Sequence, residues 1–192
     1  MVELRADAQR NLGRVLDAAA EVFAERGPDA SVDEIARRAG VGHGTVFRRF
    51  PTKDSLVAAV MCRRLAEISS AAEDLLEQPE AGEAFEQFIW EIGERFARDH
   101  ALFEGAARCA EVQQFSDAKR QLEDVVERLV LRAQEQGSLR RDIDAPDVLG
   151  LVSSAMQGAM RGSGGDAWRR YVAVVLDGLR VPAPAPAPAT SS

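Results

Sequence analysis

The sequence predicts an all-α protein of about nine helices, with an N-terminal three-helix module that contains a helix-turn-helix and a larger helical C-terminal domain. Apolar residues recur three and four positions apart along most of the chain, as they do on one face of a helix. No stretch alternates apolar and polar residues for long enough to predict a sheet, and we find no internal repeat. With 192 residues, 46% of them hydrophobic, the chain can bury a substantial core.

Three helices are expected in the first 53 residues, because three segments there have an apolar stripe and each is followed by a helix-breaking residue. The first helix is stopped by Gly27, the second by Gly40 and the third by Pro51. Ser31 opens the second helix, and Glu34 stands three residues later. This spacing predicts a capping box, in which each side chain bonds the other residue's backbone N–H.

Six further helices are expected in the rest of the chain, the first of them capped by Thr52. We expect them at 52–77, 82–99, 102–112, around 122–133, 144–161 and 168–179. The final residues alternate Pro and Ala, which predicts an extended, solvated tail. The expected parts are a helix-turn-helix module, a second helical domain and the tail, at 1–53, 54–180 and 181–192.

The composition excludes several classes of protein. No apolar run approaches 18 residues and no apolar signal segment follows Met1, so we expect a cytoplasmic protein without a membrane partner. Two cysteines are too few for a disulfide framework. Residues 1–53 carry nine basic and eight acidic side chains, whereas the remainder carries 15 and 23. Only the N-terminal part is therefore suited to an anionic partner.

Catalysis is not expected from this sequence. It contains no HExxH, CxxC or GxSxG motif and no phosphate-binding loop. Two histidines and two cysteines supply few metal ligands, and the carboxylates fall on polar helix faces. We therefore predict no enzyme, no metal site and no cofactor.

Residues 31–50 have the pattern of a helix-turn-helix, in which the second helix lies in the DNA major groove and the first crosses the backbone. Val46 and Phe50 are four residues apart and can anchor the second helix in the core. The remaining side chains of that helix then face outward. Among them, Arg48 can bond guanine bidentately and Thr45 can contact a thymine methyl group.

Over about residues 10–56, the chain closely resembles the DNA-binding domain of TetR-family transcriptional regulators. The resemblance rests on the run Ser31-x-x-x-Ile35-Ala-x-x-Ala39-Gly-Val41-x-x-Gly44-Thr45-x-Phe47-x-x-Phe50-Pro-x-Lys53-x-x-Leu56. The segment 137–144 is similar to an SbtR-like subgroup of that family.

The resemblance implies a homodimer that represses transcription and releases a near-palindromic operator when a small molecule binds the C-terminal domain. The residues it assigns to DNA are Ser31, Gly42, His43, Gly44, Thr45, Phe47, Arg48, Arg49 and Lys53. Phe47 stands where the family usually has Tyr, which removes a hydroxyl that commonly binds phosphate, and Arg49 replaces the usual His and adds charge. A transcriptional activator, or a DNA-binding protein without a ligand, could use the same motif.

A ligand cavity is expected between the C-terminal helices, because their large apolar side chains exceed what a thin bundle needs. The candidates to line it are Met61, Phe85, Phe88, Trp90, Phe96, Phe103, Cys109, Phe115 and Met156. Each of them is alternatively an ordinary core residue.

The last two helices are expected to pair with their twofold mates in a four-helix interface. They combine small residues, which allow close approach, with a large apolar stripe. The candidate interface residues are Gly150, Ser154, Gly158, Trp168, Val172 and Val175. The alternative is that both faces pack within one subunit.

Overall fold

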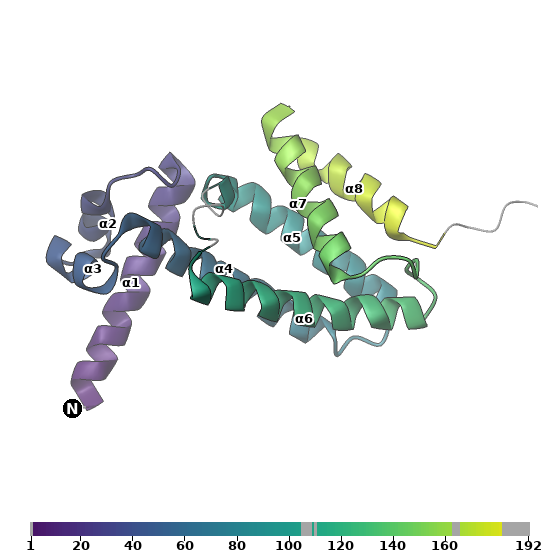
Figure 1. The fold of residues 1–192 in the computed structure, drawn as a ribbon, viewed down its shortest axis with the longest axis horizontal. Coiled ribbons are helices and arrows are strands. Elements are labelled where there is room, and N and C mark those ends of the chain that lie inside the picture. Colours follow the sequence, from purple (N-terminus) through teal and green to yellow (C-terminus); the bar gives the residue numbers. More distant parts are fainter. Residues whose placement is uncertain (1, 105–108, 110, 163–165, 182–192) are drawn as a thin grey trace, which may run out of the picture.

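The computed structural model describes residues 2–104, 109, 111–162 and 166–181, which form eight helices and no strand. The helices are α1 (Val2–Arg26), α2 (Val32–Ala39), α3 (His43–Arg49), α4 (Lys53–Leu75), α5 (Ala81–Glu104), α6 (Gln113–Glu135), α7 (Ala145–Gly162) and α8 (Ala167–Leu179). Figure 1 shows α1–α3 gathered at one end and α4–α8 extending from it as an elongated bundle. The expected all-α class and N-terminal helix-turn-helix are confirmed.

The helices α1, α2 and α3 pack with the first part of α4 around one apolar core. Its central side chains are Phe23, Ile35 and Val46, none of which is more than 1% exposed. Phe50, just after α3, is buried as well, so the two expected anchors of this helix are confirmed. Burial of such side chains is worth about 1.5–3 kcal/mol each, which holds the short helices α2 and α3 in place on α1.

A second core is formed by the five helices from α4 to α8, around side chains such as Phe88, Leu129 and Met156. In Figure 1, α6 runs along α4, while α7 and α8 form a pair. The helix α4 belongs to both cores, because its residues up to Met61 pack into the first and those from Leu65 onward into the second. A single continuous helix therefore joins the N-terminal module to the bundle.

The prediction of a separate helix at 102–112 is wrong. Leu102 belongs to α5, which continues through a kink at Asp99 (φ −106°, ψ 19°) where the sequence suggested an end. Val112 has an extended backbone (φ −84°, ψ 111°) and directly precedes α6. Cys109, which lies between α5 and α6 in the sequence, is buried, and an apolar residue at this spacing imitates a further helical turn. The parts of the expected helix and tail outside the described residues are 105–108, 110 and 182–192.

Candidate DNA interface and effector cavity

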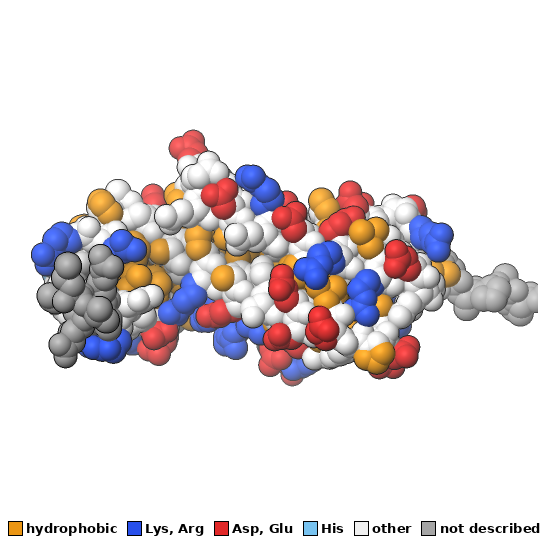
Figure 2. All heavy atoms as spheres, turned by 90° about the horizontal axis from the view of Figure 1, so that it is seen from below, with side chains coloured by type: hydrophobic (Ala, Val, Ile, Leu, Met, Phe, Trp, Pro, Cys, Tyr) orange, Lys and Arg blue, Asp and Glu red, His pale blue; other side chains and the backbone are white. Residues whose placement is uncertain are grey.

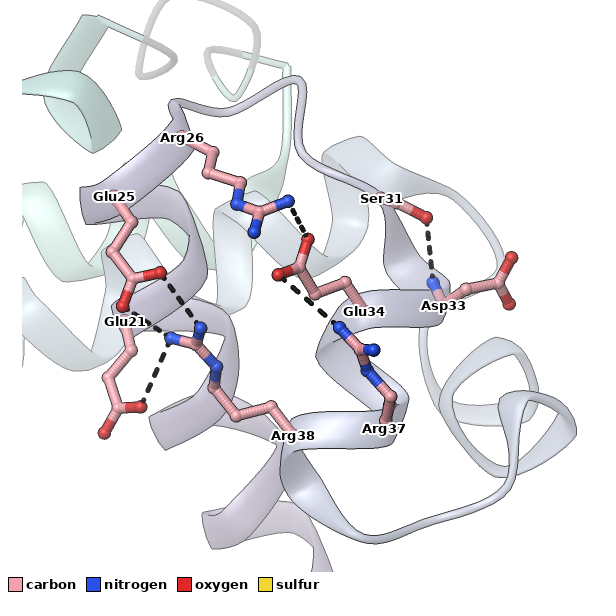
Figure 3. A network of polar contacts seen from close by, with 8 residues as sticks. All are labelled: Glu21, Glu25, Arg26, Ser31, Asp33, Glu34, Arg37 and Arg38. Atoms are coloured by element: carbon pink, nitrogen blue, oxygen red, sulfur yellow. Dashed lines mark hydrogen bonds and ion pairs between the residues drawn. The ribbon is translucent and has the colours of Figure 1, made fainter.

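The N-terminus of α2 is capped by Ser31, whose hydroxyl accepts a hydrogen bond from the backbone N–H of Asp33 (3.2 Å). The expected capping box with Glu34 is wrong. The Glu34 carboxylate turns instead to Arg26 at the end of α1 (2.7 Å), as Figure 3 shows. An ion pair to the neighbouring helix has thus replaced a bond within α2, because Arg26 lies within reach of the carboxylate.

A second ion-pair group joins α1 to α2. Arg38 donates two hydrogen bonds to the Glu25 carboxylate (2.7 and 2.9 Å) and lies 3.7 Å from Glu21 (Figure 3). The hydrogen bond from Arg38 lowers the pKa of the Glu25 carboxyl. Because these groups are exposed, they orient α2 on α1 more than they stabilise the fold.

The turn between α2 and α3 depends on Arg14 of α1. Gly40 ends α2 in the left-handed region (φ 65°). Arg14 donates from Nε to the Ala39 carbonyl (3.0 Å) and from Nη2 to the Gly40 carbonyl (3.0 Å), satisfying acceptors that a helix end leaves open. A Cβ at position 40 would lie 2.8 Å from Arg14 Nη2. The Arg14 guanidinium therefore binds backbone carbonyls of the turn that precedes α3.

All but one of the candidate DNA contacts are exposed on the helix-turn-helix. Lys53 is half-buried, with its Nζ 3.9 Å from an Asp29 carboxylate oxygen, and Arg48 donates from Nε to the Gly44 carbonyl (3.4 Å). Figure 2 shows Lys and Arg side chains around this end of the molecule. The exposed candidates are Ser31, Gly42, His43, Gly44, Thr45, Phe47, Arg48 and Arg49.

Asp33 was not among the residues that the sequence indicated for this surface. Its carboxylate contacts Nδ1 of His43, which links the starts of α2 and α3. The His43 ring also packs against Phe47, with 4.3 Å between the ring centroids. No spacing rule predicts this contact, because it depends on how the turn places one helix against the other.

A cavity of about 360 Å³ lies between α4, α5, α6 and α7. Its wall is mostly apolar, and the polar side chains that line it include an ion pair between Lys119 and Glu123 (3.7 Å). Phe96 and Phe103 of α5 stack on each other in this wall, with ring centroids 4.6 Å apart. The volume suits a small organic molecule rather than a macromolecule.

The structure brings four of the nine candidate pocket residues to this cavity: Met61, Phe96, Phe103 and Phe115. Phe85, Phe88 and Met156 are buried in the bundle core, and Trp90 meets Trp168 edge to face. Cys109 is buried with the N-terminal core. The wall residues that the sequence did not single out include Leu65, Ile68, Ile92 and Leu122.

The outer face of α7 and α8 carries large apolar side chains. Leu151, Tyr171 and Val174 are 49%, 40% and 71% exposed. The candidates Gly150, Ser154 and Gly158 are exposed on α7, and Val175 is half-buried. Trp168 and Val172 instead face inward, where they pack so closely on Gly93 that a Cβ there would lie within 3 Å of both side chains.

Two other kinds of site find no support in the part of the chain that the structure describes. No group of three or more His, Cys, Asp or Glu side chains there could hold a metal ion. None of the helices described is both long and apolar enough to cross a bilayer.

Comparison with known proteins decides the family. Residues 15–60 match bacterial regulatory proteins of the tetR family, and residues 80–181 match the C-terminal domain of SbtR-like transcriptional regulators. The crystal structure of a TetR transcription regulatory protein from Mycobacterium vanbaalenii is 38% identical over 93% of this chain and 99% of its own, with a TM-score of 0.68. The chain belongs to the TetR family of transcriptional regulators.

Two further similar proteins differ in how much of the chain they cover. The regulator SCO0520 from Streptomyces coelicolor is 27% identical over 89% of this chain and 99% of its own, with a TM-score of 0.67. The HTH-type transcriptional repressor Rv3405c of Mycobacterium tuberculosis is 58% identical over 48 residues, which span 24% of this chain and 26% of that relative. The TetR match thus includes both the helix-turn-helix and most of the bundle that holds the cavity.

Proposed function

We propose that the protein is a homodimeric repressor that binds a near-palindromic operator and leaves it when a small organic molecule occupies the cavity. Residues 1–53 form the DNA-binding part, 54–180 the ligand-binding and dimerising part, and 181–192 a tail. Since the DNA that a bacterial regulator binds lies in the cytoplasm, we assign the protein to that compartment.

The DNA-binding step rests on the exposed surface of α2 and α3. Arg48 and Thr45 are directed outward while Val46 holds α3 in the core, so polar and methyl groups are available to base edges. Ser31 and Lys53 lie at the starts of α2 and α4, where a hydroxyl and an ammonium can contact phosphates. Base contacts then supply specificity, and phosphate contacts fix the register.

Dimerisation is assigned to the outer face of α7 and α8. Leu151, Ser154 and Gly158 share one face of α7, and Tyr171 and Val174 share one face of α8. Exposed apolar patches of this kind mark interfaces, and a twofold pairing places the same residues on both sides. Tyr171 and Val174 take the place of the inward-facing Trp168 and Val172 in the interface that we propose.

The response to a ligand rests on one observation above all: α4 lines the cavity and also belongs to the DNA-binding core. Met61, Leu65 and Ile68 form part of the cavity wall. Beside them, Arg63 Nη1 lies 2.8 Å from an Asp17 oxygen of α1. A ligand that shifts α4 therefore shifts the module that carries α3, and coupling of this kind is typically worth about 1–3 kcal/mol.

The test is selection of binding sites from a random DNA library by the purified full-length protein at about 0.15 M salt, since affinity for DNA depends steeply on salt. We expect a near-palindrome with half-sites about one helical turn apart. A template whose promoter overlaps the selected site should be transcribed less when the protein is added. Binding without any sequence preference would contradict the proposal.

A further inference from the structure

We propose that His43 reads the adenine of an A·T base pair in each operator half-site, and that Asp33 is the positioning residue that sets its imidazole ring for this task. This inference rests on the proposed operator binding and adds to it the identity of one base pair. It depends on three residues of the helix-turn-helix: Asp33, His43 and Phe47.

The His43 ring is held from two sides. Its Nδ1 contacts the Asp33 carboxylate of α2, and its face packs on Phe47 one turn further along α3. Figure 3 shows the Asp33 carboxylate pointing away from the ion pairs that join α1 to α2. Asp33 is therefore available to His43, while Glu34 is engaged with Arg26.

The other ring nitrogen is left for DNA. Nε2 is separated from Nδ1 by Cε1 and points in a different direction, and no hydrogen bond to it occurs within the described part of the chain. The His43 side chain is 52% exposed and Phe47 is 39% exposed. Both rings are therefore partly exposed on the short helix that also carries Thr45 and Arg48.

The contact with Asp33 determines what Nε2 can bind. A carboxylate accepts a hydrogen bond, so the ring proton is assigned to Nδ1. In the neutral ring Nε2 then carries a lone pair and acts as an acceptor. In the major groove, hydrogen-bond donors are the amino groups of adenine (N6) and cytosine (N4). Guanine presents acceptors at N7 and O6, which a lone pair would repel.

Phe47 decides between adenine and cytosine. An aromatic ring offers apolar contact to the thymine methyl group, and thymine pairs with adenine. An acceptor and an apolar surface side by side therefore match an A·T pair, which shows an amino group and a methyl group in the major groove. A C·G pair shows the amino group without the methyl group.

The experiment measures the dissociation constants of full-length variants for the selected operator and for a panel with one base pair changed at a time. We expect the wild type to prefer A·T over G·C about tenfold at one half-site position. His43→Ala and Asp33→Ala should each reduce this preference below about threefold at that position and leave other positions unchanged. Asp54→Ala removes another exposed first-turn carboxylate and should leave every preference intact.

A second arm replaces the thymine at that position with deoxyuridine, which lacks only the methyl group. The wild type should bind the deoxyuridine DNA about threefold more weakly than the thymine DNA. Phe47→Ser should bind the two DNAs equally well. Unchanged preferences in His43→Ala, or a wild-type preference for G·C at the position that His43 controls, would overturn the inference. If the wild type selected no sequence at all, the proposed operator binding itself would have failed.

Discussion

Arg64 of α4 and Asp99 of α5 form an ion pair at the kink of α5, with 3.1 Å between Nε and Oδ2. Asp99 is 3% exposed and has the non-helical backbone of the kink. The pair lacks hydrogen-bond alignment, so both atoms remain buried without a hydrogen bond. The stacked rings of Phe96 and Phe103 lie on either side of this kink in the sequence and line the cavity. The pair therefore ties α4 to the part of α5 that borders the cavity.

Asp99→Asn should lower the free energy of unfolding by about 1–3 kcal/mol, because it removes the buried carboxylate beside Arg64 Nε and leaves this guanidinium only its ion pair with Glu67. Urea denaturation at neutral pH measures the change. The control is Asp124→Asn on the exposed side of α6, for which we expect a change within about 0.5 kcal/mol. Equal effects of the two substitutions would show that the pair adds nothing to stability.

Arg14→Met should weaken operator binding about tenfold while leaving its salt dependence unchanged, because Arg14 holds the α2–α3 turn and neutralises no phosphate. Lys53→Ala should reduce the slope of log K against log salt by about 0.9, the value of one phosphate contact. Fluorescence anisotropy at several salt concentrations distinguishes the two variants. A reduced slope in Arg14→Met would instead place its guanidinium on DNA.

Gly158→Asp should convert the dimer to monomers, because it places a charge on the exposed face of α7 next to Tyr171. Light scattering at micromolar concentration measures the mass. Gly13→Asp is the matched control, since it also adds a carboxylate within a helix and a Cβ there has nothing within 4 Å. If Gly158→Asp remained a dimer, the interface would not include this face of α7.

The Asp142 carboxyl should titrate with a pKa of about 2, because hydrogen bonding to Arg140 lowers it from 3.8. The folded-state pKa lies below the unfolded value, so the pair stabilises the fold above about pH 4 and loses this effect as the pH falls toward 2. Carbon-13 NMR of the carboxyl groups measures the pKa directly. A value near 3.8 would mean that the contact with Arg140 does not persist in solution.

The sequence was sufficient for the helix-turn-helix because its signals are local. Gly40 and Pro51 end two helices, and Val46 and Phe50 anchor the second of them. It was not sufficient for Asp33, whose contact with His43 exists only once two helices are placed against each other.

The bundle was harder to predict because its apolar residues have three possible roles. Leu65 and Ile68 belong to an ordinary apolar stripe, and only the packing of four helices leaves a cavity beside them. Trp168 and Tyr171 are three residues apart on α8, yet one faces the core and the other is exposed. Helical periodicity shows that a face is apolar without showing whether a subunit core, a ligand or a second subunit covers it.

The central claim is that filling the cavity releases the operator. Ser153 lines the cavity from α7, so Ser153→Trp places an indole there without a need to know the natural ligand. Ser70→Trp, on the exposed side of α4, is the control. We predict that the operator dissociation constant rises about 5- to 150-fold in Ser153→Trp and stays unchanged in Ser70→Trp, with both proteins folded. Equal operator affinities in the two variants would contradict the account.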